Sequence, residues 1–216
     1  MKLLILGATG GTGRQLVQQA LEDANTEVTA LVRDASKLGS VANHERLSVV
    51  VRATPLTRPA LSEVVPGQDA VLVALGAGGA KTPHDLIRGT LAVLLSVMRD
   101  AGVRRLVVIT AAPVPETPKA AFLLHHVVRP MLWRFFGNDY ADMQRAEALL
   151  SSDAATDVQW TVVRPPYLTD GGVHKPYRVS ADKPLFGRVS RADVARFMLE
   201  VVKSDAFVGR GVWVAY

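Results

Sequence analysis

Seven residues near the start of the chain, Gly7-Ala-Thr-Gly-Gly-Thr-Gly13, constrain the fold more than any other stretch. An apolar run over residues 3–6 leads into this loop, and a helical pattern follows it. The sequence therefore predicts a strand, a tight turn and a helix, with Gly7 at the turn, Gly10 facing a ligand and Gly13 in the helix–strand contact. Because the N-terminus of a helix favours an anion, the loop predicts a pyrophosphate site. The expected contacts are Gly7, Thr9, Gly10, Gly11, Thr12 and Gly13.

The context of the loop distinguishes this prediction from a simpler one. A glycine-rich loop alone also occurs in hairpins and flexible links. Here a second strand pattern, Glu27-Val-Thr-Ala-Leu-Val32, follows after about twenty residues, which completes the strand–helix–strand unit that dinucleotide binding needs. We therefore favour a dinucleotide site over a flexible link.

Strand and helix patterns alternate along most of the chain. Apolar runs predict further strands over residues 47–51, 70–75, 103–110 and 158–163, and helical spacing predicts helices over residues 60–65, 82–101, 140–151 and 190–203. This alternation is typical of an α/β protein, so we predict a Rossmann-type doubly wound, mostly parallel sheet. The length of 216 residues fits a single domain, 1–216, in which residues from about 165 onward contribute a small C-terminal substrate lobe.

Two stretches interrupt the alternation. Three prolines within residues 111–118 predict a loop. Residues 120–136 are strongly apolar but contain His and Arg, which favours a helix beside the substrate side of the sheet or at a subunit contact over a membrane span. The pair His125 and His126 has no carboxylates at ligand spacing, and adjacent helical residues point about 100° apart, so no metal site is predicted.

Composition narrows the class of protein. The chain has no cysteine, which excludes disulfides and thiolate chemistry, and its 49% hydrophobic and 21% charged residues are ordinary for a globular protein. The net charge of +5 comes from scattered cations such as Arg104 and Arg105, which are interpreted as surface charges and do not favour a nucleic-acid partner. The apolar stretch after Lys2 is too short for a signal peptide. We expect a cytoplasmic monomer or homodimer that binds a small-molecule substrate and neither nucleic acid nor membrane.

Six motifs together resemble those of a known family. They are the loop of residues 7–13, Leu31-Val-Arg-Asp34, Gly67-Gln-Asp-Ala-Val71, Tyr140-Ala-Asp-Met143, Trp160-Thr-Val-Val-Arg-Pro-Pro166 and Ser190-Arg-Ala-Asp193. Over nearly the entire chain, the set resembles the atypical short-chain dehydrogenase/reductase family with NAD(P)H-binding, NmrA-like domains. Within that family it is most similar to the biliverdin-IXβ reductase, or flavin reductase, branch.

The resemblance implies a dinucleotide lying across the strand ends, with its nicotinamide near the ends of the fourth and fifth strands. The sequence itself places residues 164–168 at the same edge, where open α/β sheets bind ligands, so this segment is expected to form pocket wall. Further cofactor contacts are expected at Leu75, Gly76, Thr110, Ala111, Arg164 and Pro165.

Arg33 bears on which dinucleotide is bound. NAD enzymes of this fold usually carry an acidic residue at the end of the second strand, where it binds the ribose 2′-OH, whereas an arginine accommodates a 2′-phosphate. Arg33, together with Lys37, therefore favours NADP(H) over NAD(H). If Arg33 is only an exposed charge, Asp34 is the residue that would lie near the ribose.

The catalytic positions depart from the family pattern. Short-chain reductases commonly use a tyrosine whose pKa is lowered by a lysine four residues later, and the corresponding residues here are Tyr140 and Gln144. The serine expected after the fifth strand is replaced in Thr110-Ala111-Ala112, and Ala53-Thr54 replaces the usual Gly-Asp after the third. Tyr140 and Thr110 are the remaining candidates for catalytic residues.

Hydride transfer to an electron-poor conjugated ring does not require that triad, because positioning beside the nicotinamide supplies most of the catalysis. The leading hypothesis is an NADPH-dependent oxidoreductase acting on a dissociable flavin, quinone-like or tetrapyrrole acceptor, with Tyr140, Arg164 and Tyr167 contacting substrate. The alternative is a non-catalytic NADP(H)-binding sensor or regulatory protein of NmrA-like type. A conventional carbonyl reductase or sugar-nucleotide epimerase is disfavoured by Gln144 and by the short C-terminal lobe.

Overall fold

An eight-stranded sheet forms the centre of the protein, with strand order β3-β2-β1-β4-β5-β6-β10-β8. The computed structural model describes residues 1–54, 56–76, 85–114, 129–173 and 176–216. Neighbouring strands of the sheet are parallel except for β8, which is antiparallel to β10. This arrangement confirms the predicted Rossmann-type, mostly parallel sheet. The strands are β1 (Lys2–Leu6), β2 (Glu27–Val32), β3 (Leu47–Val51), β4 (Ala70–Val73), β5 (Arg105–Ile109), β6 (Gln159–Arg164), β8 (Arg178–Ser180) and β10 (Arg210–Ala215).

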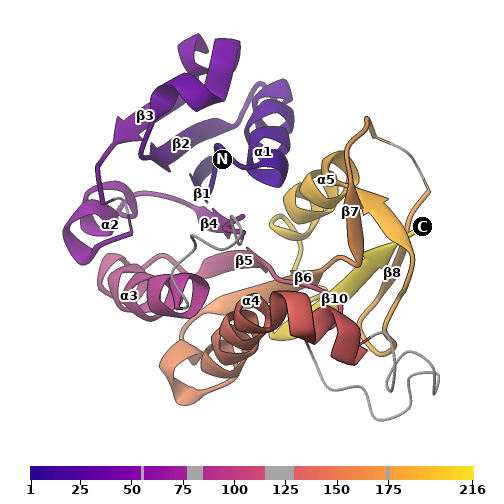
Figure 1. Ribbon diagram of the computed structural model, residues 1–216. Helices are drawn as coiled ribbons and strands as arrows, with labels where there is room; N and C mark the ends of the chain where they lie inside the picture. Colours follow the sequence, from indigo (N-terminus) through magenta and orange to yellow (C-terminus); the bar gives the residue numbers. More distant parts are fainter. Residues whose placement is uncertain (55, 77–84, 115–128, 174–175) are drawn as a thin grey trace.

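Helices cover both faces of this sheet (Figure 1). Side chains of one strand alternate between the two layers, so Leu3 and Ile5 pack on one side and Leu4 and Leu6 on the other. The central strands are thus buried on both faces, which explains why they are continuous apolar runs in the sequence. One layer holds α1 (Gly11–Glu22) and α5 (Arg191–Val201), and the other holds α2 (Arg58–Val64), α3 (Leu86–Ala101) and α4 (Arg129–Leu150).

Beyond β6, the chain contributes to the main sheet and to a second, smaller one. β7 (Tyr167–Thr169) and β9 (Arg188–Ser190) pair in parallel as a two-stranded sheet, at the right of Figure 1. β8 and β10 join the main sheet, and α5 packs beside α1. The segment from about residue 165 onward is therefore divided between the two sheets, and its role as a substrate lobe stays a prediction. Short 3₁₀ segments, η1 (Ala35–Asn43) and η3 (Asp153–Ala155), complete the described elements.

The long helix α4 differs from the sequence-based expectation. The sequence predicts one helix over residues 120–136 and another over 140–151, whereas α4 continues without a break from Arg129 to Leu150. An interior glycine such as Gly137 costs a helix only about 1 kcal/mol relative to alanine. Burial of a single large apolar side chain such as Leu150 contributes about 2 kcal/mol, so packing outweighs the local preference for a break.

Several sequence predictions lie outside the described residues. These are residues 115–118 of the proline-rich loop, the start of the apolar stretch before α4, and the pair His125 and His126. Within the described part of the chain, no helix is both long and apolar enough to cross a membrane. The described residues also contain no group of three side chains suited to hold a metal ion.

Arg105 corrects the interpretation of the scattered cations as surface charges. It lies at the start of β5 and is only 7% exposed. One guanidinium nitrogen, Nη1, donates to the Gln159 carbonyl at 2.6 Å and to Thr161 Oγ1 at 3.0 Å, while Nη2 donates to the Val201 carbonyl at the end of α5. Burial lowers the pKa of Arg105. A cation at a helix C-terminus is favourable, so this arginine joins the sheet to α5.

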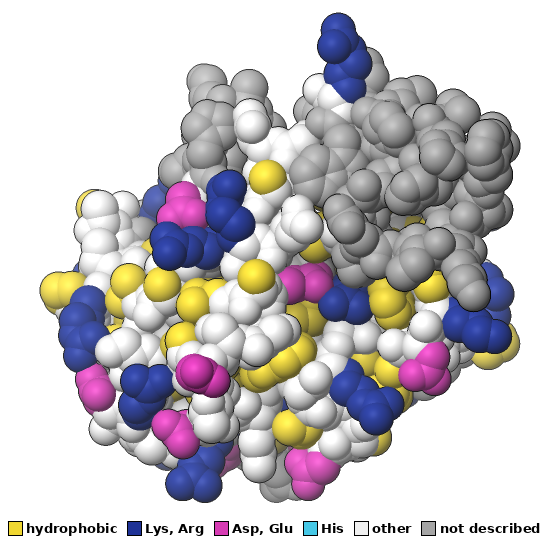
Figure 2. Space-filling view, turned by 90° about the horizontal axis from the view of Figure 1, so that it is seen from below, with side chains coloured by type: hydrophobic (Ala, Val, Ile, Leu, Met, Phe, Trp, Pro, Cys, Tyr) yellow, Lys and Arg dark blue, Asp and Glu magenta, His cyan; other side chains and the backbone are white. Residues whose placement is uncertain are grey.

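The remaining surface cations are mixed with carboxylates. On the face seen in Figure 2, the described Lys and Arg side chains are scattered among Asp and Glu and form no continuous basic field. Arg52 pairs with Glu63, and Arg58 pairs with Asp100 at 2.6 Å. Exposed pairs of this kind contribute little to stability, typically below about 1 kcal/mol each.

Candidate functional site

The glycine loop joins the end of β1 to the start of α1, and its first glycine is required by two constraints. Gly7 has a φ of +84°, a conformation that L side chains rarely adopt. A Cβ atom on Gly7 would also lie 2.4 Å from the carbonyl oxygen of Ala74, just beyond β4. The turn closes through a hydrogen bond from the Gly10 N–H to the Gly7 carbonyl, at 3.0 Å.

Gly13 brings α1 into contact with the backbone of this loop. A Cβ atom at Gly13 would lie 2.0 Å from the Gly7 carbonyl oxygen, which real Cβ contacts essentially never do. By contrast, Gly10 and Gly11 are exposed, and Thr12 is buried. The local geometry thus fits the roles predicted for Gly7 and Gly13, while contact of the loop with a cofactor stays a prediction.

The N-terminus of α1 is open to an anion. The N-cap residue, Gly10, contributes no side-chain hydrogen bond, and the first turn contains no acidic residue. Among the described residues, no acceptor engages the N–H groups of Gly11, Thr12 and Gly13. Unpaired donors and the positive end of the helix dipole together suit a phosphate group.

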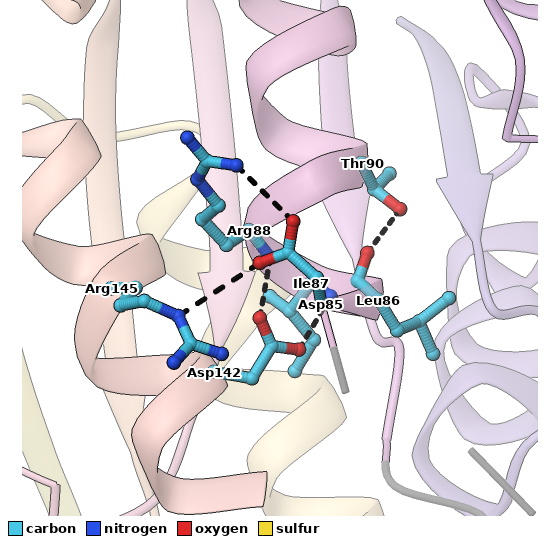
Figure 3. A network of polar contacts seen from close by, with 7 residues as sticks. All are labelled: Asp85, Leu86, Ile87, Arg88, Thr90, Asp142 and Arg145. Atoms are coloured by element: carbon cyan, nitrogen blue, oxygen red, sulfur yellow. Dashed lines mark hydrogen bonds and ion pairs between the residues drawn. The ribbon is translucent and has the colours of Figure 1, made fainter. Parts of the chain in front are cut away.

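The N-termini of α3 and α5 are closed by side chains, as Figure 3 shows for α3. Asp142 of α4 accepts hydrogen bonds from the N–H groups of Ile87 and Arg88, at 2.8 and 3.1 Å. At the start of α5, the Ser190 hydroxyl accepts from the Asp193 N–H at 3.0 Å, as the capping pattern of the sequence predicts. Of these three helices, α1 is therefore the one whose first N–H groups have no described side-chain or backbone acceptor.

The buried Asp142 has further charged neighbours in the same network (Figure 3). Asp85 pairs with Arg88 of α3 at 3.2 Å and with Arg145 of α4 at 3.8 Å, so the second of these pairs also joins α4 to the start of α3. Asp142 itself is only 4% exposed. Because its carboxylate already occupies the start of α3, a phosphate there would meet a like charge.

The end of β2 presents a cation at the same edge of the sheet as the glycine loop. Arg33 is exposed and makes no hydrogen bond or ion pair with any other residue that the structure describes, and Lys37 is exposed in η1. Asp34 instead caps η1, accepting from the Ser36 hydroxyl at 2.7 Å and from the Ser36 N–H at 3.0 Å. These hydrogen bonds lower the pKa of Asp34. Contact of Asp34 with a ribose would therefore compete with its local cap, whereas Arg33 has no such competing bond.

At the ends of β5 and β6, the candidate residues Thr110 and Arg164 meet on one carboxylate. Thr110 Oγ1 donates to Glu147 Oε1 of α4 at 2.7 Å. Arg164 Nη2 lies 2.6 Å from Glu147 Oε2, and Arg164 Nε lies 3.2 Å from both carboxylate oxygens. Because Thr110 gives its proton to Glu147, its oxygen can only accept a hydrogen bond from a ligand in this arrangement.

Arg164 is enclosed on its other sides by β10. Its guanidinium lies 4.6 Å from the centre of the Trp213 ring. A Cβ atom on Gly211 would lie 2.1 Å from the guanidinium carbon, so the missing side chain at that position makes room for the cation. Only 15% of the Arg164 side chain is exposed. In this structure Arg164 thus binds Glu147 and lies over Trp213. Its contact with cofactor or substrate stays a prediction.

The surroundings of Tyr140 differ from those of a catalytic tyrosine of this fold, whose pKa is lowered. Its side chain is half-buried and packs against the core layer of α2, α3 and α4. Burial, and then the charge of Asp139, raises the pKa of Tyr140. Gln144, at the position of the family's lysine, is exposed. The pKa of Tyr140 is therefore shifted in the direction opposite to the shift that the family's lysine produces.

The other predicted contacts lie along the C-terminal edge of the sheet. Leu75 and Gly76 follow β4, and Ala111 follows β5. Pairing of the segments after β5 and β6 extends to a hydrogen bond from the Ala112 N–H to the Pro165 carbonyl, at 2.9 Å. Parallel strands bring these segments to the edge where the glycine loop also lies. Tyr167, on β7, is 74% exposed.

The sequence leaves two interpretations of Glu147, a surface group or a group that supports the contacts of the site from behind. Its side chain is only 12% exposed and binds Thr110 and Arg164, which fits the second interpretation. A signal was present, because Glu147 follows Tyr140 by seven residues and so shares its helix face. Asp142 gave no comparable signal, since its partners at the start of α3 are more than fifty residues away.

A model of the NAD(P)H-binding family matches residues 7–205. The chain therefore belongs to this family. Membership confirms the resemblance to atypical short-chain dehydrogenases/reductases and the predicted class, an NAD(P)H-binding oxidoreductase.

Individual proteins are also similar to the chain. The oxidoreductase aflX of Aspergillus parasiticus is 28% identical, in an alignment covering 93% of this chain and 77% of aflX. The anaerobillin reductase ChuY of Escherichia coli O157:H7 has a TM-score of 0.81 at 18% identity, covering 100% of this chain and 97% of ChuY. A short-chain dehydrogenase/reductase of Veillonella parvula in complex with NADP has a TM-score of 0.77 at 17% identity, covering 100% and 94%. At these identities the two structures establish the shared fold.

Proposed function

We propose that the protein is an NADPH-dependent reductase that passes a hydride to a dissociable conjugated acceptor such as a flavin, a quinone or a linear tetrapyrrole. The observation that carries the proposal is the open N-terminus of α1, at the same sheet edge as the unengaged Arg33. The helix start suits a pyrophosphate, and a guanidinium suits a 2′-phosphate. These are the two anionic groups of NADPH.

The proposed acceptor class follows from the candidate acids. Bound NADPH supplies a hydride, and the protein binds and orients the two reactants. Thr110 gives its proton to Glu147, and the pKa of Tyr140 is raised, so neither is poised as a proton donor. A conjugated ring spreads the incoming electron pair and takes its proton from solvent, whereas an isolated carbonyl needs a positioned acid.

The similar proteins support the same class. The protein aflX is named as an oxidoreductase, and ChuY is named as a reductase of anaerobillin. Both names agree with a reductase built on this fold, although fold alone does not determine substrate. A tetrapyrrole acceptor is therefore included in the proposal beside flavins and quinones.

Consumption of NADPH tests the proposal. The protein is mixed with NADPH and, in turn, FMN, FAD, riboflavin, a quinone and biliverdin, and the nicotinamide absorbance is followed. We expect at least one acceptor to give a rate above that of the protein-free mixture. Binding of NADPH without consumption for any acceptor would instead support the second candidate, a sensor, which the raised pKa of Tyr140 also favours.

Replacing Arg33 by alanine tests the choice of cofactor. Loss of a charge-assisted hydrogen bond costs about 1.5–3 kcal/mol, so the Kd for NADPH is expected to rise roughly tenfold or more. The Kd for NADH is expected to stay within about twofold, because NADH has no 2′-phosphate. Calorimetric titration of both dinucleotides measures the two values.

Arg210→Ala is the matched control, since Arg210 is an exposed arginine at the start of β10, away from the carboxyl ends of the strands. Equal weakening of NADPH and NADH by Arg33→Ala, or no weakening at all, would contradict the assignment of the 2′-phosphate to Arg33.

A further inference from the structure

An arginine outside the predicted site lies across the start of α1. Arg191 is the first residue of α5, which packs beside α1 (Figure 1). A Cβ atom added to Gly11 would lie 2.6 Å from Arg191 Cδ and 2.8 Å from Arg191 Nε. The side chain of Arg191 therefore crosses the first turn of α1, and the bare backbone of Gly11 makes this approach possible.

The base of this side chain is firmly held. The preceding residue, Ser190, is fully buried, and its hydroxyl caps α5 through the Asp193 N–H at 3.0 Å and donates to Asp193 Oδ2 at 2.9 Å. Tyr216 also donates its hydroxyl to Asp193 Oδ2, at 2.5 Å. The backbone of Arg191 is thus fixed, while the tip of its side chain remains accessible, with 30% of the side chain exposed.

The tip of Arg191 is paired with an aspartate of the small sheet. Thr169 of β7 is in register with Ser190 of β9, so the residues that follow, Asp170 and Arg191, emerge side by side. Arg191 Nη1 lies 2.7 Å from Asp170 Oδ1. The Asp170 side chain is 93% exposed, and exposed pairs of this kind are weak because water screens them.

We propose that Arg191 binds the pyrophosphate of the dinucleotide and that Asp170 holds this arginine at the site until the ligand replaces it. The inference rests on the proposed dinucleotide site at α1. A pyrophosphate at that helix start lies within reach of a guanidinium that already crosses the first turn. Asp170 takes only one hydrogen bond from this guanidinium, through Nη1, whereas two phosphate groups carry more negative charge and can accept bidentate hydrogen bonds.

This role is distinguishable from that of Arg33. The pyrophosphate is common to NADPH and NADH, whereas the 2′-phosphate belongs to NADPH alone. Arg191→Ala is therefore expected to raise the Kd of both dinucleotides by the same factor, about tenfold. Arg191→Lys keeps the charge but loses the fork of donors, so we expect an intermediate loss.

The Asp170→Asn variant tests the ion pair between Asp170 and Arg191 without altering the buried core. Asp170→Asn removes the competing charge and is expected to tighten both dinucleotides by about two- to fivefold, a size typical of an exposed ion pair. In the Arg191→Ala background the same Asp170→Asn change is expected to have no effect, because the two residues act through one contact.

Calorimetric titration of NADPH and NADH into the wild-type protein and the four variants, Arg191→Ala, Arg191→Lys, Asp170→Asn and the Arg191→Ala/Asp170→Asn pair, measures all of these values. Unchanged affinity in Arg191→Ala, or a loss confined to NADPH, would overturn the pyrophosphate contact. If Asp170→Asn lowered the Kd equally with and without Arg191, Asp170 would not act by holding Arg191. Its effect would then be long-range repulsion of the dinucleotide. Failure of the wild-type protein to bind either dinucleotide would refute the underlying site instead. Thermal unfolding of each variant verifies that it is folded.

Discussion

A Gly13→Ala variant is expected to lose measurable dinucleotide binding and about 3 kcal/mol of folding free energy, at the upper end of the range for overpacked positions. The added methyl group would lie 2.0 Å from the Gly7 carbonyl oxygen, which belongs to the backbone of the loop itself. Relief of this overlap requires α1 to move away from β1. That movement displaces the open helix start that the proposed pyrophosphate occupies. Urea unfolding and calorimetric titration of NADPH measure the two losses.

Gly89→Ala is the matched control, since Gly89 also lies inside a helix, α3. The nearest atom to its added Cβ is Asp85 Oδ2 at 3.4 Å, an ordinary contact. Alanine is the better helix former, so this variant is expected to gain up to about 1 kcal/mol. If Gly13→Ala bound NADPH like the wild-type protein, the packing role assigned to Gly13 would be wrong.

Removal of Glu147 is expected to cost about 3–5 kcal/mol of folding free energy, the range for one partner of a buried ion pair. Glu147→Ala leaves the guanidinium of Arg164 without its carboxylate in a setting where only 15% of that side chain is exposed. It also removes the acceptor of the Thr110 hydroxyl. Both consequences arise at the ends of β5 and β6. Urea unfolding compares the variant with the wild-type protein.

The exposed pair of Arg52 and Glu63 provides the comparison. It too joins a guanidinium to both oxygens of a carboxylate, but its side chains are 45% and 46% exposed. Glu63→Ala is therefore expected to cost less than about 1 kcal/mol. If Glu147→Ala and Glu63→Ala lowered the free energy of unfolding equally, the buried contacts of Glu147 would stabilise the fold no more than an exposed ion pair does.

Local patterns made the fold predictable from the sequence. Buried parallel strands appear as short apolar runs, and the positive φ of Gly7 is a requirement of the turn itself. The cap of α5 was also readable, because Ser190 and Asp193 are three residues apart. Each of these features depends on neighbours in the chain.

Contacts between distant segments limited the prediction of the site. The sequence alone favours a surface position for Arg105, because its partner, the Val201 carbonyl, belongs to the distant helix α5. The position of Arg164 at a strand end is evident from the sequence, but its partner Glu147 depends on how α4 lies over the sheet. Likewise, nothing near Gly11 in the sequence points to Arg191, which lies 180 residues further along. Side chains that act through tertiary contacts therefore required the structure.

The most direct test of the central claim is a single turnover of bound NADPH. The protein is loaded with NADPH without free excess and mixed anaerobically with the most active acceptor of the panel, and the absorbances of nicotinamide and acceptor are followed together. Both signals are expected to decay at one rate, and deuterium at the transferred position of the nicotinamide is expected to slow that rate. NADPH that stays bound and unoxidised with every acceptor would contradict a reductase and leave a protein that only binds the dinucleotide.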